Sequence, residues 1–193
     1  MQDYFAKAEE QLEIFWNNQS VFKKYFDMLD TRYTVELACG HGRHVHRYID
    51  RSQNIYLVDV SSENITFCKN RFKDEKKIYY IKNDGHTLNK IENSSVTSLF
   101  TYDSMVHFEM IDIFDYLRET YRILQPGGKA LFHHSNNDGD YMTTFATGTC
   151  GRNYMSKDLF GYLVNRAGLK IIAQEEIDWE GHEKLDCLTL VQK

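Results

Sequence analysis

The stretch that decides the fold is VELACGHGRHVH, residues 35–46. It begins as a short apolar run typical of a buried β-strand, includes one acid, and then passes into Gly-His-Gly. Glycines directly after a strand let the backbone approach a bound cofactor closely, because a Cβ atom there would collide with it. The histidines of the same stretch also suit a metal site, so the rest of the chain must decide between the two.

The composition predicts one globular domain that binds neither nucleic acid nor a membrane. The chain has 193 residues, 42% of them hydrophobic, and a net charge of -5 from 23 basic and 28 acidic residues. This balance lacks the basic face that phosphate backbones require. No apolar run approaches the roughly 18 residues of a membrane helix, and the acidic N-terminus lacks the apolar core of an export signal. The four cysteines form no Cys-x-x-Cys pair, which is typical of reduced thiols and predicts a cytoplasmic location.

Strands and helices alternate along the first two thirds of the chain, which predicts parallel βαβ units. Helices are expected over 3–29, 43–50, 61–72, 109–124 and 156–167, and strands over 33–39, 54–59, 77–84, 95–103, 129–135, 169–176 and 185–192. Gln-Pro-Gly-Gly at 125–128 is expected to form a turn before the fifth strand. The last two strands should pair antiparallel, since residues 177–184 are too few for a crossover helix.

Glycines or acids follow three successive strands. Gly40 and Gly42 follow the first, Asp59 ends the second, and Asp84 ends the third. Ligands of doubly wound sheets bind beyond these carboxyl ends. The Asp59 carboxylate can accept hydrogen bonds from ribose hydroxyls, and that of Asp84 from an adenine amino group. Each acid alone could be a helix cap or a turn residue, but together they predict a nucleoside cofactor.

Two residues favour a cationic nucleoside over a dinucleotide. Val45 stands where the dinucleotide motif Gly-x-Gly-x-x-Gly has its third glycine. Glu36, four residues before Gly40, places a carboxylate where a pyrophosphate would be repelled. S-adenosylmethionine carries a sulfonium and an ammonium group, so it suits this pocket better. A nicotinamide cofactor remains an alternative.

These motifs resemble those of the class I S-adenosylmethionine-dependent methyltransferases. The matching stretches are VELACGHGR (35–43), LVDVS (57–61), IKNDGHTL (81–88), SLFTYDSMVHF (98–108) and ILQPGGKALFHHS (123–135). The resemblance implies an α/β, Rossmann-like fold: a seven-stranded sheet of order 3-2-1-4-5-7-6, with strand 7 antiparallel and helices on both faces. It also implies S-adenosyl-L-methionine as cofactor. The implied cofactor-binding residues are Glu36, Ala38, Gly40, His41, Gly42, Asp59, Val60, Asn83, Asp84, Gly85 and Tyr102.

The three histidines of the opening stretch are not expected to bind a metal. His41 belongs to the glycine loop, and His44 and His46 fall on the following helix, with His44 near its exposed start. A metal site needs ligands on one face, such as i and i+4, and a third from elsewhere. Three acids could instead hold a divalent cation, although such loop residues commonly form turns. These acids are Asp103, Asp138 and Asp140.

Three other histidines are candidates for catalysis. Methyl transfer to a hydroxyl requires a positioned acceptor and removal of its proton, and imidazole is a suitable general base. His107 follows the fourth strand, while His133 and His134 end the fifth on opposite faces. We favour His134 and His107 as the functional pair, with one histidine of the fifth strand packed under a helix.

The acceptor is expected to be a small hydroxylated molecule. Tyr102-Asp103-Ser104-Met105 lacks the Asn/Asp-Pro-Pro-Tyr/Phe segment of many enzymes that methylate amide or base nitrogens. The loop 136–156 is polar and aromatic, which suits a sugar or a sugar nucleotide, and Arg152 could pair with a phosphate or carboxylate. The motifs MVHFE and FHHSN also resemble small methyltransferases of the bacterial surface-polysaccharide type. Alternatives are N-methylation of an amino sugar or small amine, and a cofactor-binding module without catalysis.

The N-terminal residues are expected to cap a single methyltransferase domain that spans 1–193. Residues 1–30 form the helical cap, with an aromatic face that packs on the sheet. Its start, Tyr4-Phe5, is predicted to fold over the cleft as a lid that excludes water. The sequence indicates no particular oligomeric state.

Overall fold

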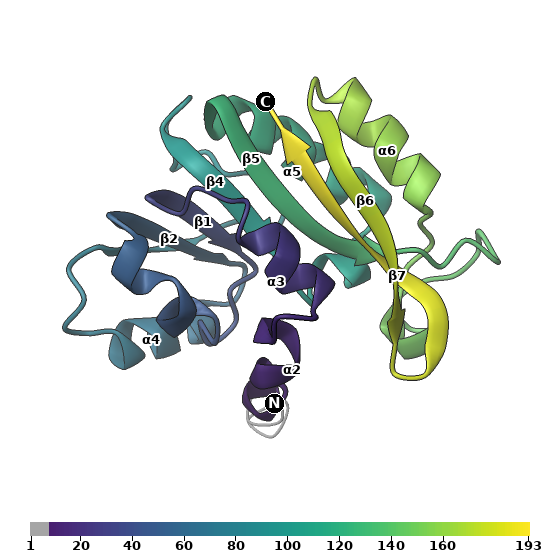
Figure 1. Cartoon of the computed structure of the whole chain (residues 1–193), viewed down its shortest axis with the longest axis horizontal. Helices are drawn as coiled ribbons and strands as arrows, with labels where there is room; N and C mark the ends of the chain where they lie inside the picture. The colour runs from purple at the N-terminus through teal and green to yellow at the C-terminus, as the bar shows by residue number, and fades with distance from the viewer. Residues whose placement is uncertain (1–7) are drawn as a thin grey trace.

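The computed structural model, which describes residues 8–193, is built on one seven-stranded sheet (Figure 1). The strands are β1 (Tyr33–Leu37), β2 (Asn54–Asp59), β3 (Ile78–Lys82), β4 (Val96–Thr101), β5 (Leu124–Ser135), β6 (Lys170–Trp179) and β7 (His182–Gln192). Their order is β3-β2-β1-β4-β5-β7-β6, and β7 runs antiparallel to both neighbours while β1–β5 pair in parallel. The predicted order and the reversed last strand are therefore confirmed.

Helices cover both faces of the sheet. They are α2 (Leu12–Trp16), α3 (Val21–Phe26), α4 (Ser62–Arg71), α5 (Met110–Ile123) and α6 (Lys157–Arg166), with short 3-10 turns at Val45–Arg47, Ile49–Arg51, Met105–His107 and Thr149–Gly151. Ser61 and Ser156 cap α4 and α6 by accepting hydrogen bonds from Asn64 and Leu159. None of the described helices is long and apolar enough to cross a membrane.

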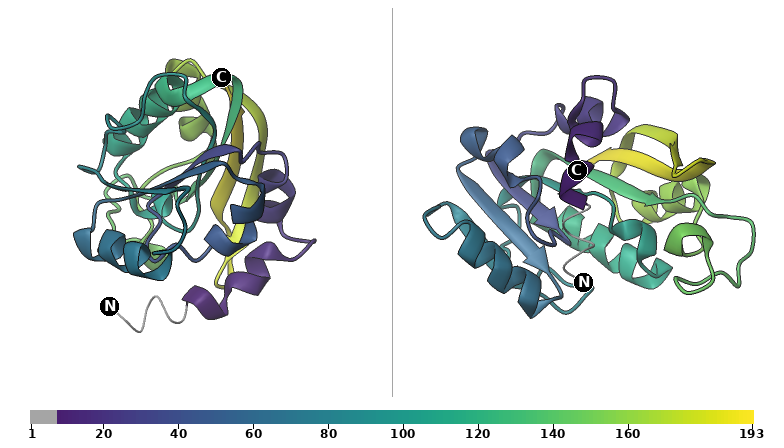
Figure 2. Two further views of the ribbon diagram at one scale, coloured as in Figure 1. Left: turned by 90° about the vertical axis from the view of Figure 1, so that its left-hand side faces the viewer. Right: turned by 90° about the horizontal axis from the view of Figure 1, so that it is seen from below.

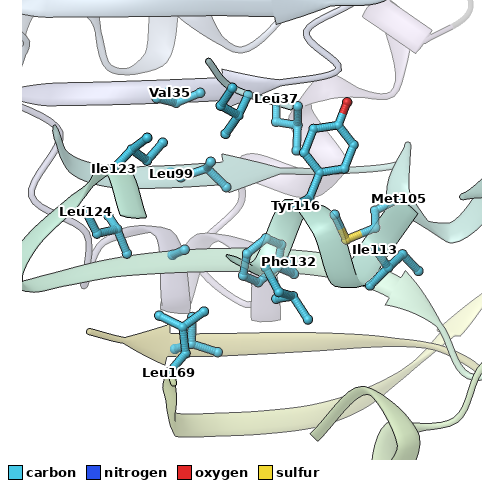
Figure 3. Close-up of a cluster of buried hydrophobic side chains, with 14 of the residues drawn as sticks. Val35, Leu37, Leu99, Met105, Ile113, Tyr116, Ile123, Leu124, Phe132 and Leu169 are labelled. Carbon is cyan, nitrogen blue, oxygen red and sulfur yellow. The ribbon is translucent and has the colours of Figure 1, made fainter. Parts of the chain in front are cut away.

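Two apolar cores lie on opposite faces of the sheet. Buried residues of α5 and α6, such as Leu117 and Phe160, pack on one face, and Figure 3 shows part of this core around Tyr116 and Phe132. Aromatic residues of α2 and α3, such as Trp16 and Phe26, pack on the other face together with buried residues of α4. Figures 1 and 2 show α3 on the side of the sheet opposite α5 and α6. The strands buried on both faces read as continuous apolar runs for this reason.

The expected helix over 3–29 is wrong in the part that the structure describes. Asn17 is extended (ψ 156°) and separates α2 from α3, and Ser20 caps α3 by accepting a hydrogen bond from the Lys23 amide. Local side-chain bonds of Asn and Ser thus compete with helix continuation. The predicted lid tip, Tyr4-Phe5, lies outside the described residues.

Two further expectations are corrected. Residues 43–50 form two 3-10 turns instead of a helix, because Tyr48 leaves helical geometry (φ -135°) as its buried hydroxyl donates to Glu36. Gln-Pro-Gly-Gly does not end before β5 but lies inside it as a bulge, where Gly127 has φ 81° and bonds the carbonyl of Lys193. The strands β6 and β7 are also longer than expected and meet in a tight turn at Glu180-Gly181, both with positive φ.

Candidate active site

The carboxyl ends of β1 and β4 carry two non-glycine residues in left-handed conformation. Ala38 and Asp103 both have φ 55°, and Gly40 has φ 54°. Such conformations cost about 1–3 kcal/mol for a non-glycine residue and cluster at functional sites. Both residues line two adjoining hollows, which we call the β2–β3 hollow and the β1 hollow. The strained backbone therefore shapes the edge where the sequence predicts the cofactor.

The β2–β3 hollow has a volume of about 300 Å³ and contains the predicted ribose acid. Its lining residues are Leu37, Ala38, Gly40, Asp59, Val60, Asn64, Asn83, Gly85, Asp103, Ser104, His107, Phe108, Asp112 and Tyr116. Asp59 accepts hydrogen bonds from the amides of Gly40 (2.8 Å) and Ser61 (2.8 Å), so it also ties two loops together. Asn64 Nδ2 also donates to Oδ1 (3.2 Å), so Oδ2, which accepts only from Gly40, has further acceptor capacity for a ligand hydroxyl.

Asn83 marks the far side of this hollow. Its Nδ2 donates to the Tyr116 hydroxyl (2.7 Å) and the Thr87 carbonyl (3.0 Å), while its buried Oδ1 has no partner among the described residues. Burial raises the pKa of Tyr116 to about 12, so this hydroxyl is neutral. Asn83 lines the hollow, and its unpartnered Oδ1 could accept from a donor such as an adenine amino group after a small movement of the side chain.

Two predicted cofactor residues have other local roles. A Cβ on Gly42 would lie 2.8 Å from a ring carbon of Phe72, and its φ is 70°, so this glycine serves close packing. The exposed Asp84 caps its own turn by accepting from the amide (2.8 Å) and hydroxyl (2.7 Å) of Thr87, which lowers its pKa. Neither residue lines a hollow described here for residues 8–193, whereas the neighbouring Asn83 and Gly85 line the β2–β3 hollow.

The β1 hollow is smaller, about 50 Å³, and has an acidic lining. Its lining residues are Ala8, Glu9, Glu36, Leu37, Ala38, Cys39, Gly40, His41, Arg43, His44, Tyr102, Asp103 and Ser104. Glu36 is 2% exposed and accepts from the Tyr48 hydroxyl (2.6 Å), and burial raises its pKa to about 7. Arg43 pairs with Asp103 (3.0 Å). The carboxylates of Glu9, Glu36 and Asp103 thus outnumber the one guanidinium, which favours a cationic ligand.

Residues from Ala8 to Trp16 contact the loop and helix beside the β1 hollow. The Ala8 carbonyl accepts from Arg43 (3.1 Å), Glu9 pairs with Arg71, and Trp16 donates to Nδ1 of His44 (3.1 Å). His44 is 3% exposed, so the expected exposed position is wrong, and burial lowers its pKa well below the ordinary range. His41 stacks on Phe67 with 3.7 Å between ring centroids. Within residues 8–193, no cluster of His, Cys, Asp and Glu has the arrangement of a metal site.

A third cavity, the β4 hollow, adjoins the other two through Asp103. It has a volume of about 280 Å³ and is lined by Ala8, Gln11, Asp103, His107, Cys150, Arg152, Trp179 and Glu180. Nδ1 of His107 lies 2.8 Å from the Gly151 carbonyl, so Nδ1–H donates and Nε2 keeps its lone pair. No described residue bonds Nε2, and His107 lines both this hollow and the β2–β3 hollow.

The two histidines of β5 point to opposite faces, as predicted, but neither lines a described hollow. His133 accepts from the Asp103 amide (2.9 Å) through Nδ1 and donates to Asp186 (2.9 Å) through Nε2. His134 uses Nδ1 on the Ser135 carbonyl and Nε2 on the Thr189 hydroxyl, each 2.8 Å away. Burial lowers the pKa of His134 to about 3. This geometry gives no support to His134 as a base.

Arg152 is held by a buried carboxylate that the sequence reasoning missed. Its Nε and Nη2 donate to Asp186 (2.9 and 2.6 Å), its Nη1 donates to the Cys150 carbonyl, and its guanidinium lies 4.9 Å above the Trp179 ring. The guanidinium of Arg152 is therefore already paired and is not free to bind a phosphate of the acceptor. An acid within the apolar run LDCLTLV (185–191) was the available signal for Asp186.

Comparison with known proteins identifies the family. Residues 35–132, just over half of the chain, match the family described as "Methyltransferase domain". The chain belongs to this family. It is a class I S-adenosylmethionine-dependent methyltransferase, and its cofactor is S-adenosylmethionine. No curated protein sequence matches the chain significantly.

Solved structures of methyltransferases share the fold at low sequence identity. A Mesorhizobium loti S-adenosylmethionine-dependent methyltransferase has a TM-score of 0.72 and 14% identity over 89% of this chain and 97% of its own. The partner of the Trm112 methyltransferase activator from Haloferax volcanii has a TM-score of 0.72 and 16% identity over 97% and 93%. Geranyl diphosphate C-methyltransferase from Streptomyces coelicolor, solved with Mg²⁺, geranyl diphosphate and S-adenosyl-L-homocysteine, has a TM-score of 0.69 and 14% identity over 88% and 75%.

The described residues fit this methyltransferase cofactor chemically. Asp59 and Asn83 offer acceptors to the adenosine half, and Glu36 and Asp103 place carboxylates where a cationic half would lie. When bound, S-adenosylmethionine supplies an electrophilic methyl group on a positively charged sulfur. The roles of the individual residues remain predictions.

Proposed function

We propose that this methyltransferase acts on a hydroxyl group of a small-molecule acceptor, a sugar or related metabolite, and that His107 is the general base. The observation that carries the proposal is the hydrogen bond between Nδ1 of His107 and the Gly151 carbonyl (2.8 Å). This bond leaves Nε2 as a proton acceptor at the junction of the β4 and β2–β3 hollows. Of the three predicted catalytic histidines, His107 alone lines a described hollow.

The proposed reaction balances with one proton transfer. The acceptor oxygen forms a bond to the methyl carbon while the bond from that carbon to sulfur breaks. Nε2 of His107 takes the hydroxyl proton and later releases it to water. Two contacts position Asp103 between the hollows. Its backbone N–H donates a hydrogen bond to Nδ1 of His133 (2.9 Å), and its carboxylate forms an ion pair with Arg43 (3.0 Å). Correct placement of an acceptor supplies much of the rate enhancement in such reactions.

The N-terminal residues support the exclusion of water in this proposal. Glu9 and Trp16 are tied to the cofactor-side loop through Arg71 and His44. We therefore propose that residues 1–30 act as a cap on a single domain that spans the chain. We also propose that the protein has no nucleic-acid partner, which the net charge of -5 supports. A cytoplasmic location is part of the same proposal and is supported by the four free cysteines.

A second candidate is methylation of a small amine. Asp103 and Glu180 both line the β4 hollow, and carboxylates would attract an ammonium group. His107 could then accept the proton that the amine must lose before transfer.

A transfer assay separates these candidates. Purified full-length protein is incubated with methyl-labelled S-adenosylmethionine and a panel of sugars, sugar nucleotides and amines, and the methylated atom is located by mass spectrometry and NMR. His107→Gln is expected to lower kcat by about 10²-fold or more, because the proton acceptor is lost. His134→Gln is the matched control, with both ring nitrogens of the parent residue bonded away from the hollows. A wild-type kcat for His107→Gln would refute His107 as the general base, and label on amines alone would refute the hydroxyl acceptor.

A further inference from the structure

A fourth cavity, larger than the β4 hollow, opens beside it. It lies between α2, the start of α3 and the β6–β7 hairpin, has a volume of about 480 Å³, and is called here the α2–β6 groove. Its apolar lining consists of Ile14, Phe15, Val21, Phe22, Ile177, Trp179 and Leu188. Ile14 is 63% exposed, so an isoleucine side chain faces water at this groove. Covering it with an apolar ligand group would be favourable.

The α2–β6 groove and the β4 hollow adjoin each other. Gln11, Trp179 and Glu180 line both of them. The Trp179 ring stacks on Phe15 (5.9 Å between centroids, 14° between planes) and carries the Arg152 guanidinium 4.9 Å from its centroid. Because partners hold this ring, it forms a fixed wall shared by the two cavities. An elongated molecule would have to pass along this wall to reach both cavities.

The hydroxyl of Tyr102 offers a polar contact at the edge of the α2–β6 groove. Tyr102 is 7% exposed and lines the α2–β6 groove and the β1 hollow. Its ring packs against Phe22 (4.3 Å) and His133 (4.6 Å), yet no described residue bonds its hydroxyl. The hydroxyl is not one of the fully buried polar atoms that lack a partner, so it is accessible and can bond a polar atom of a bound molecule.

The charges around the two cavities exclude an anionic acceptor. Asp103, Asp178 and Glu180 contribute carboxylates to the lining. Among the described lining residues of both cavities, the sole Arg or Lys is Arg152, and its guanidinium is already paired with Asp186. A phosphate would meet carboxylates without a free cation to balance it. This argues against a sugar nucleotide. For the hydroxyl acceptor proposed above, it favours an uncharged head group.

We infer that the acceptor is an uncharged amphiphile. Its hydroxyl-bearing head lies in the β4 hollow beside His107, and its apolar chain or ring lies in the α2–β6 groove, with the Tyr102 hydroxyl bonding a polar atom of the acceptor. This inference rests on the proposed function and names the substrate class for the same site. The two volumes, about 280 and 480 Å³, lie in the range of small-molecule sites.

Binding of n-alkyl β-glucosides tests the inference without requiring turnover. Methyl, butyl, hexyl and octyl glucoside are titrated into full-length protein saturated with S-adenosylhomocysteine, by calorimetry and below the micelle-forming concentration. The Kd is expected to fall about two- to fourfold for each added methylene until the groove is filled. Octyl phosphate is expected to bind at least about tenfold more weakly than octyl glucoside, because its charge meets the carboxylates.

Matched isoleucine variants separate the groove from non-specific binding. Ile14→Ser, in the groove, is expected to weaken octyl glucoside about three- to tenfold and to leave methyl glucoside unchanged. Ile172→Ser is the control, since Ile172 is 43% exposed on β6 and does not line the groove. Three results would overturn the inference: a Kd that does not change with chain length, an equal loss of octyl glucoside affinity in both variants, or no binding of any glucoside. Chain-length-dependent binding without methyl transfer to any hydroxyl would instead overturn the proposed function alone.

Discussion

Glu36 couples the stability of the protein to cofactor binding through its ionisation. Burial raises its pKa from the ordinary value of 4.5 to about 7, although the Tyr48 hydroxyl bonds its carboxylate. Below pH 4.5 the carboxyl is protonated in both the folded and the unfolded chain. Above pH 7 it is ionised in both, and the folded protein then bears the cost of a buried charge. Stability is therefore lost as the pH rises between these values.

The magnitude follows from the two pKa values. Roughly 1.4 kcal/mol corresponds to each pKa unit, so the rise from 4.5 to about 7 amounts to about 3 kcal/mol. Glu36→Gln removes the ionisation. We expect the variant to be more stable than the wild type by less than about 1 kcal/mol at pH 5 and by up to about 3 kcal/mol at pH 9.

Urea unfolding of the ligand-free protein, followed by tryptophan fluorescence at pH 5, 7 and 9, measures this difference. Glu183→Gln, which changes an exposed glutamate on β7, is the control and should show no such pH-dependent gain. In the same series, S-adenosylmethionine should bind the wild type about tenfold more weakly at pH 6 than at pH 8, because Glu36 must first lose its proton. Glu36→Gln should lack this component. A constant stability difference between Glu36→Gln and wild type from pH 5 to 9 would refute the reasoning.

Two other substitutions test the cofactor edge and the network behind the β4 hollow. Asp59→Ala is expected to weaken S-adenosylmethionine binding by about 1–3 kcal/mol in calorimetry, since ligand hydroxyls lose their acceptor, and an unchanged Kd would remove Asp59 from the site. Asp186→Asn leaves the Arg152 guanidinium buried without its counter-ion, so thermal or urea unfolding should show a loss of about 3–5 kcal/mol. A loss no larger than that of the exposed control Asp158→Asn would contradict the buried ion pair.

The cofactor edge was largely predictable because its signals are local. Gly40 and Asp59 follow apolar runs whose length and order define parallel strands, and the carboxyl ends of such strands meet at one edge. The two acids predicted to bind the cofactor, Asp59 and Asp84, nevertheless lie in different environments. Asp59 faces the hollow, whereas Asp84 turns back on Thr87, because a short polar loop can satisfy its own carboxylate.

The acceptor side was less predictable because its contacts join distant parts of the chain. His134 resembled a base in sequence, but pairing of β5 with β7 places the Thr189 hydroxyl on its Nε2. In sequence, Arg152 resembled a free cation, but in the structure it is bound by Asp186, which lies 34 residues later in the chain. Periodicity predicts which residues face inward, but it does not say which side chain from another strand will meet them.

The site divides along the chain in a way that bears on how new substrates arise. The stretch shared with the family ends at residue 132, whereas Cys150, Arg152, Trp179 and Glu180 of the β4 hollow come after it, and Gln11 comes before it. Under the proposed function, insertions or exchanges in the tip of the β6–β7 hairpin and in the loop after β5 are expected to alter which acceptor enters and to leave the predicted cofactor edge unchanged. Chimaeras that swap these two segments between methyltransferases of this fold are thus a direct route to transplanting substrate preference.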